Sequence, residues 1–217
     1  MNRWIARILA ALVVALGLVP LTAGASWACS CAAPAFTESQ QWRSVAAKAP
    51  VVYVAEVTGR TGGPTQNPDG GTGPGEYRYS LRVVESLKGG ATGTRTGTTS
   101  DQGSACGATL QQRRRVLVYD ERLSLCGGFT QERVPERATI VRDAVAGRPS
   151  SHVVVRGEWL WQIARTELTV QGPTFARPSD TAVDRAARRL HQVNRRAIGS
   201  DPDRLRPGTR LVVPPLS

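Results

Sequence analysis

The chain has 217 residues, of which 41 % are hydrophobic and 21 % are charged, and its formal net charge is +11. This composition excludes a disordered chain, a collagen-like repeat and a multi-span membrane protein. The positive charge favours a polyanionic partner. Nearly all the cationic residues are arginine, which a GC-rich genome would also produce.

A secretory signal is predicted over residues 1–28. Cationic residues precede an apolar run over 8–18, which is too short to span a membrane. Cleavage is expected after Ala25 or after Ala28, and the second site makes Cys29 the first mature residue. A lipid anchor at Cys29 is the disfavoured alternative, because a serine stands where an apolar residue is expected. Export argues against nucleic acid as the partner.

The four cysteines are Cys29, Cys31, Cys106 and Cys126. In an exported chain, an even number of cysteines favours disulfides over metal ligands. Cys29 and Cys31 are too close together to pair comfortably with each other. Two connectivities are therefore open, 29–106 with 31–126 or 29–126 with 31–106. Either one attaches the mature N-terminus to the body of the protein.

The first predicted element is a helix over 38–48, which a capping box at 37–40 begins and Pro50 ends. Glycine and proline over 59–75 predict an exposed loop, and the spacing of apolar residues over 134–145 predicts a second helix. Strands are expected over 51–57, 77–87, 93–100 and 115–119. Short strands with a helix at each end predict a small β-barrel with flanking helices.

A Cys-x-Cys pair, Cys29-Ser30-Cys31, precedes this set of strands, and Cys106-Gly107 and Cys126-Gly127 follow within it. Over 29–147, the pattern resembles the netrin-like domain of tissue inhibitors of metalloproteinases. The resemblance implies an OB-fold β-barrel with disulfides Cys29–Cys106 and Cys31–Cys126. The chain lacks the additional cysteines and the C-terminal domain of the animal inhibitors.

The same resemblance raises the hypothesis of a zinc-metalloprotease inhibitor. In that mechanism, the free α-amino group and the carbonyl of Cys29 would chelate the catalytic zinc of the protease. The amine must be neutral, which its ordinary pKa allows near neutral pH. We prefer the simpler interpretation, in which Cys29 and Cys31 are structural staples and the ligand of this domain is unknown.

After a linker over 148–150, the remaining segment predicts a strand, two helices and a closing strand. The first strand is expected over 152–156, and a helix begins near Trp159. A proline-bearing loop over 171–179 leads to a second helix, with Asp180 or Thr181 as its cap. The last strand is expected near the C-terminus.

Residues 152–164 match the pattern V-x-x-G-[DE]-x-L-x-x-I-A, and Asn194 with residues 198–214 match a second half. Over 151–217, these motifs resemble the LysM domain, a small α+β domain with βααβ order. Two departures stand out. The segment between the helices is longer than usual, and Trp159 replaces the usual serine or threonine, which removes a hydroxyl that can cap the helix.

The LysM resemblance implies binding of peptidoglycan or a related glycan that contains N-acetylglucosamine. The ligand would lie in a groove between two turns, where backbone groups meet acetamido groups and apolar side chains meet sugar faces. The candidate residues of the first wall are Gly157, Glu158, Trp159 and Leu160. Those of the second wall are Ile198, Gly199, Asp203, Leu205 and Arg206.

No motif of a hydrolase, metalloenzyme or nucleotide-binding protein is present in the sequence. The two histidines, His152 and His191, are interpreted as structural or exposed, and 113–115 as a solvated hairpin or a docking site for anionic glycan. The sequence therefore predicts a secreted, non-catalytic cell-wall protein with no cofactor and no metal. A wall-targeted enzyme is the remaining alternative.

Overall fold

The computed structural model describes residues 36–101, 106–124 and 126–216. The predictions for the signal segment, Cys29 and Cys31 lie outside the described residues. The elements in chain order are α2 (Glu38–Lys48), β1 (Val52–Gln66), β2 (Thr72–Lys88), β3 (Thr94–Ser100), β4 (Arg115–Val118), β5 (Phe129–Thr130), α3 (Val134–Val145), β6 (Ser150–Val153), α4 (Leu160–Gln171), α5 (Asp180–Ile198) and β7 (Arg210–Val213).

Strands β1 to β5 form an antiparallel sheet whose two faces bury different residues of the same strands. In β1, Val52 and Val54 pack with α2 and α3, whereas Tyr53, Ala55 and Val57 pack on the other face. Side chains of a strand alternate between faces, so the uninterrupted apolar run of β1 serves both clusters. The sheet is thus the centre of this part of the protein, with both helices on one side.

The prediction of a closed OB-type barrel is wrong. The strand order is β3-β2-β1-β4-β5, and within the described residues β3 and β5 do not pair with each other. The segment between β4 and β5 pairs with β3 at an isolated parallel bridge between Thr98 and Arg122, beside an ion pair between Glu121 and Arg95. Strand β5 has two residues, which is too short an edge to close the sheet.

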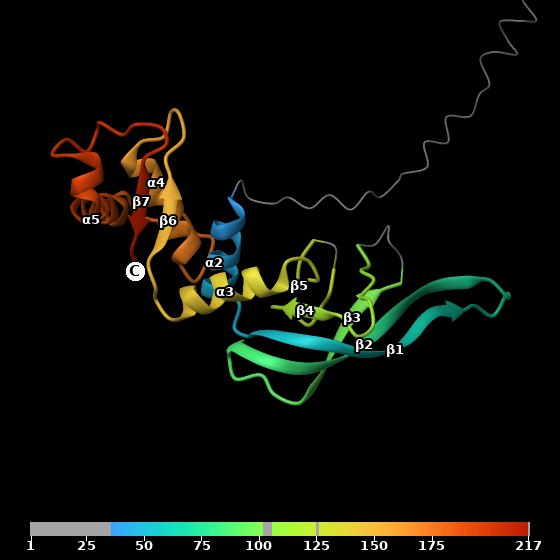
Figure 1. Ribbon diagram of the computed structural model, residues 1–217. Helices are drawn as coiled ribbons and strands as arrows, with labels where there is room; N and C mark the ends of the chain where they lie inside the picture. The colour runs from blue at the N-terminus through green and yellow to red at the C-terminus, as the bar shows by residue number, and fades with distance from the viewer. Residues whose placement is uncertain (1–35, 102–105, 125, 217) are drawn as a thin grey trace, which may run out of the picture.

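The prediction of an exposed loop over 59–75 is also wrong. Strand β1 continues to Gln66 and β2 begins at Thr72, so the two strands project from the sheet as a long arm (Figure 1). The glycines allow two backbones to approach closely rather than to form a loop. A Cβ on Gly75 would lie 1.8 Å from the carbonyl oxygen of Gly63.

Helix α2 begins with the predicted capping box. Thr37 Oγ1 accepts a hydrogen bond from the Gln40 amide at 3.3 Å, and Gln40 Oε1 accepts one from the Thr37 amide at 3.0 Å. In the first turn, Glu38 binds Arg137 Nε at 2.9 Å and Arg133 Nη1 at 2.7 Å. The hydrogen bond from Arg137 lowers the pKa of Glu38, and Arg133 lowers it further.

Replacing Glu38 by glutamine is expected to reduce stability at pH 7 by less than about 1 kcal/mol, because the carboxylate is partly exposed. The folded pKa lies below the ordinary 4.5, so the contribution of Glu38 is present above pH 4.5 and is lost as the pH falls through the folded value. Urea unfolding of both proteins between pH 7 and 2 measures this. The matched control is Glu132→Gln, because Glu132 is 84 % exposed and lies 3.7 Å from Arg137. An unchanged difference at low pH would contradict the assignment.

The C-terminal elements do not form a separate body, which corrects the predicted two-domain architecture. Helix α2 packs against α4, and Arg43 binds Glu167 through two hydrogen bonds of 2.6 and 3.0 Å. Gln40 Nε2 donates to the same carboxylate at 3.0 Å. Arg43 is 8 % exposed and Glu167 is fully buried. This buried contact joins the sheet-bearing part and the C-terminal part into one structure.

Lys48, at the end of α2, caps the last turn of α4. Its ammonium group donates to the carbonyls of Thr169, Val170 and Gly172 at 2.7 to 3.0 Å and lies 4.5 Å from the ring centre of Phe175. The last carbonyls of a helix have no partner within the helix, so a cation from a neighbouring element satisfies them. Burial lowers the pKa of Lys48.

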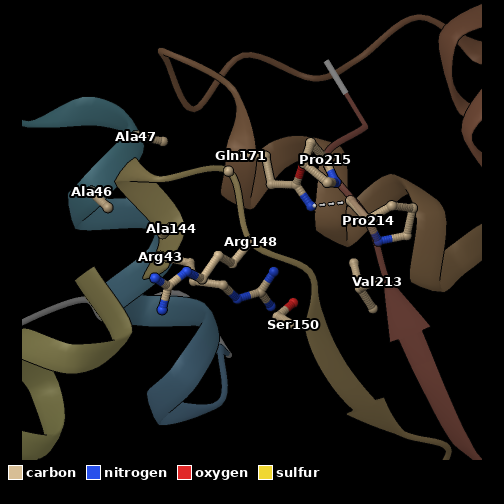
Figure 2. A pocket seen from close by; sticks show the side chains of 11 residues that line it. Arg43, Ala46, Ala47, Ala144, Arg148, Ser150, Gln171, Val213, Pro214 and Pro215 are labelled. Carbon is tan, nitrogen blue, oxygen red and sulfur yellow. Dashed lines mark hydrogen bonds between the residues drawn. The ribbon is translucent and has the colours of Figure 1, made fainter. Parts of the chain in front are cut away.

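A pocket opens at this junction between α2, α3, α4 and β7 (Figure 2). Most of the polar groups that line it have partners within the chain, whereas the buried Ser150 Oγ has none in the described part of the chain. Arg43 binds Glu167, Arg148 binds Asp143, and Gln171 Nε2 donates to the carbonyl of Pro214. None of the nine predicted glycan-binding residues lines this pocket. We therefore interpret the pocket as a feature of the junction.

The C-terminal elements follow the order β6, α4, α5 and β7, and β6 pairs antiparallel with β7. Strand β6 begins at Ser150, the last residue of the predicted linker. Helix α5 begins after Ser179, whose hydroxyl accepts a hydrogen bond from the Ala182 amide, so the cap lies just before the predicted Asp180 or Thr181. A shared apolar cluster from both helices, β7 and Val154, the residue after β6, holds these elements together.

Candidate functional site

The turn before α4 is held by Glu158, one of the predicted glycan contacts. Its Oε2 accepts a hydrogen bond from the Val155 amide at 2.8 Å and lies 2.8 Å from His152 Nε2. Gly157 has a φ of +88°, a conformation that favours glycine. The carboxylate of Glu158 therefore already has two partners in the turn, and the turn fixes where the next residue points.

Trp159 follows this turn and forms an exposed aromatic surface with Trp161. The two rings are stacked, with centroids 5.6 Å apart and planes at 24°, and Trp159 is 56 % exposed. Arg165 lies 4.2 Å from the Trp161 ring centre, and Trp161 Nε1 donates to Asp184 Oδ1 at 2.7 Å. We call Trp159 and Trp161 the tryptophan platform. Its geometry is fixed by α4 and α5 together.

The absence of a hydroxyl at position 159 has the expected consequence at the start of α4. Trp159 is the N-cap residue and makes no side-chain capping bond. Its indole ring is thus not used by the helix end, and it lies over Trp161 instead. Leu160, the next predicted contact, is 5 % exposed and packs in the apolar cluster below the platform.

The second predicted wall forms a hollow at the end of α5. Four of its predicted residues line that hollow, namely Ile198, Gly199, Leu205 and Arg206. The fifth, Asp203, does not line it. The hollow also includes Asp201, which accepts a hydrogen bond from the Asp203 amide at 3.0 Å and lies 3.6 Å from Arg204. The lining is mainly polar and lies beside the C-terminal end of a helix.

The structure brings the two turns near each other but does not combine all nine predicted residues around one hollow. Val154, just before the first turn, is hydrogen-bonded to Gly208 and Thr209, just after the second. Gly157, Glu158, Trp159 and Leu160 do not line the hollow at the end of α5. The structure thus offers an aromatic surface on one side and a polar hollow on the other.

Sequence analysis missed the ring stacking of Trp161 and its bond to Asp184. The alternation Trp159-Leu160-Trp161 was a visible signal, because it places a tryptophan on each side of a leucine. Trp159 is the N-cap residue with extended backbone, so its ring can lie over that of Trp161. The partner Asp184 lies 23 residues further along the chain, and only the packing of α5 on α4 brings it to the ring.

A shallow pocket of the sheet includes Tyr53, Arg95 and Tyr119. Burial raises the pKa of Tyr53 to about 12, so this phenol stays protonated at neutral pH. Arg95 is already paired with Glu121 at 2.6 Å. This pocket contains no residue that the sequence singled out for glycan binding.

Cys106 and Cys126 are both disulfide-bonded. The predicted pairing also involves Cys29 and Cys31, which lie outside the described residues, so it stays a prediction, as does the zinc-chelating role of Cys29. In the described part of the chain, no group of three or more histidine, cysteine or acidic side chains could hold a metal ion. Among these residues, no helix combines the length and apolar composition that a membrane crossing requires.

Comparison with known proteins adds no family assignment. No protein-family model matches the chain, and no match is found among curated proteins.

Proposed function

We propose that this chain is a secreted, non-catalytic protein that binds a cell-wall glycan of the peptidoglycan type through its C-terminal elements. The observation that carries the proposal is the exposed indole of Trp159, stacked on Trp161 at the start of α4. An exposed, rigid aromatic surface suits the apolar face of a sugar ring, because it buries apolar area at little cost in side-chain entropy.

The platform belongs to the segment that resembles LysM in sequence, which supports a glycan containing N-acetylglucosamine as the ligand class. The neighbouring turn contains two exposed residues, Arg156 and Gly157, whose backbone groups are candidates to meet an acetamido group. The polar hollow at the end of α5 offers a second place for sugar hydroxyls. The sheet-bearing part would then be displayed at the wall, and the proposal assigns no ligand to that part.

Trp159→Ala is expected to weaken sedimentation with insoluble peptidoglycan by about tenfold or more, because the variant removes the outer ring of the platform. Trp159→Phe should retain most of the binding, since a smaller aromatic ring remains. The matched control is Phe175→Ala, which removes another exposed aromatic ring, 64 % exposed, outside the platform. The assay belongs at physiological or higher salt, where binding through charge alone is weakened. Equal binding of Trp159→Ala and the unaltered protein would refute the proposal.

A further inference from the structure

Helix α5 carries five arginines on the face opposite its buried residues. The residues that pack inward are Val183, Ala186, Leu190 and Asn194. The arginines are Arg185, Arg188, Arg189, Arg195 and Arg196, and all five are exposed. At about 100° per residue, Arg185, Arg189 and Arg196 lie within about 40° of one another around the helix, and they span about 17 Å along it. We call these five residues the arginine face.

The arginine face is electrostatically uncompensated within the described residues, where none of the five forms an ion pair. In the sheet-bearing part, some arginines are paired, whereas the exposed Arg113, Arg114 and Arg115 form no ion pair within the described residues. Arg78, Arg82, Arg95, Arg133 and Arg142 each lie within 3.1 Å of a carboxylate oxygen. Arg185 stands three and four residues before Arg188 and Arg189, a spacing at which like charges destabilise a helix, and an anionic ligand would offset that cost.

The arginine face begins beside the tryptophan platform. Trp161 donates to Asp184, which precedes Arg185, and Arg188 lies one helical turn after Asp184. Arg188 and Arg195 therefore lie on the side of α5 that Trp161 contacts, and Arg185, Arg189 and Arg196 follow further around the helix. Guanidinium groups bind phosphate oxygens in a fixed planar geometry, and the indoles suit sugar faces.

We infer that this surface of α4 and α5 binds a wall glycan that carries a phosphodiester polymer. The sugar rings of the glycan would lie on the tryptophan platform, and the phosphates of the polymer along the arginine face. The inference rests on the proposed function and specifies its ligand class.

An anionic membrane is a poorer match to the arginine face. Helices that lie in a membrane surface insert an apolar face between the lipids. The apolar face of α5 is already packed against α4 and β7, where Val183 and Leu190 are fully buried. Val193 is the large apolar residue of α5 that is exposed, and it lies at the edge of the arginine face.

The test compares the unaltered chain with Arg185→Gln/Arg189→Gln/Arg196→Gln. The matched control is Arg78→Gln/Arg82→Gln/Arg142→Gln, which removes the same charge from exposed residues of the sheet-bearing part. Binding is measured to phosphate-bearing cell walls, to the same walls after hydrofluoric acid has removed their phosphodiesters, to chitin beads and to phosphatidylglycerol vesicles. Circular dichroism and thermal unfolding establish that each variant folds.

We expect the unaltered chain to bind phosphate-bearing walls about tenfold more tightly than treated walls, with a preference that weakens as salt rises. The α5 variant should lose this preference while keeping its binding to treated walls and chitin, and the control variant should retain it. The inference is overturned if the control loses as much as the α5 variant, or if treated and untreated walls bind equally. It is equally overturned if vesicles bind through α5 as tightly as walls do.

The proposed function is tested separately, by measuring Trp159→Ala with the same walls and chitin beads. If Trp159→Ala leaves binding to treated walls and chitin unchanged, the platform is not a glycan site. A preference for phosphate-bearing walls that still depends on α5 would then keep the charged half of this surface as a polyanion site.

Discussion

Replacing Glu167 by leucine is expected to lower the free energy of unfolding by about 3–5 kcal/mol, because the variant leaves the Arg43 guanidinium buried without its counter-charge. The effect is large because Glu167 is fully buried and accepts hydrogen bonds from both Arg43 and Gln40. A protein of this kind has a total stability of about 5–15 kcal/mol, so this one change removes a large share. Urea unfolding at pH 7 measures it.

The second arm of this experiment separates the charge from the packing. Arg43→Met/Glu167→Leu removes both charges and should recover much of the loss, since apolar side chains of similar size often replace a buried pair without cost. Glu85→Leu is the exposed control. Its partner Arg142 lies at 2.6 Å with half of its side chain in solvent, so the loss should stay within about 1 kcal/mol. A double variant as unstable as Glu167→Leu would show that the buried charge is not the cause.

Replacing Asn194 by leucine is expected to lower stability by about 2–4 kcal/mol, because three hydrogen bonds are lost together. Asn194 Nδ2 donates to the carbonyls of Leu190 and Val212 at 2.8 Å, and its Oδ1 accepts from the Val212 amide at 2.7 Å. The side chain thus completes the backbone bonding of β7 from α5. Asn194 is 4 % exposed, so water cannot replace the lost partners.

Asn194→Asp tests the same contact through protonation. The aspartate keeps an acceptor for Val212 but faces two carbonyl oxygens where the asparagine placed its amide group, so the loss should be large at pH 7. It should diminish in acid, where a protonated carboxyl can donate again. Gln192→Leu, at an exposed position of α5, is the matched control and should change stability little. Equal losses for Asn194→Leu and Gln192→Leu would contradict this role.

Sequence patterns predicted most of the local structure correctly. The capping box at Thr37 begins α2, and the alternation of Tyr77, Tyr79, Leu81 and Val83 places these residues on one face of β2. The capping box spans four residues and the alternation seven, so residues near in sequence determine both signals. The loop over 59–75 was predicted wrongly because glycine and proline there permit the close strand pairing of the arm instead of breaking it.

The candidate site also combines features that the sequence predicted with features that depend on tertiary packing. The motif residues around Gly157 and Gly199 predict two turns, and Trp159 marks an exposed aromatic position. The stacking on Trp161 and the bond to Asp184 depend on how α4 and α5 pack, and the charge of the arginine face becomes meaningful only once its inward face is known.

The amino-acid sequence by itself determined where the helices and most strands lie and which residues form the turns of the C-terminal segment. Tertiary structure decided that the sheet stays open and that the two parts of the chain are joined. Arg43 and Glu167 are 124 residues apart in sequence, and a long-range ion pair leaves no periodic signal that a local pattern could reveal. Sheet closure likewise depends on whether two distant edges meet, and here β5 is too short to provide one.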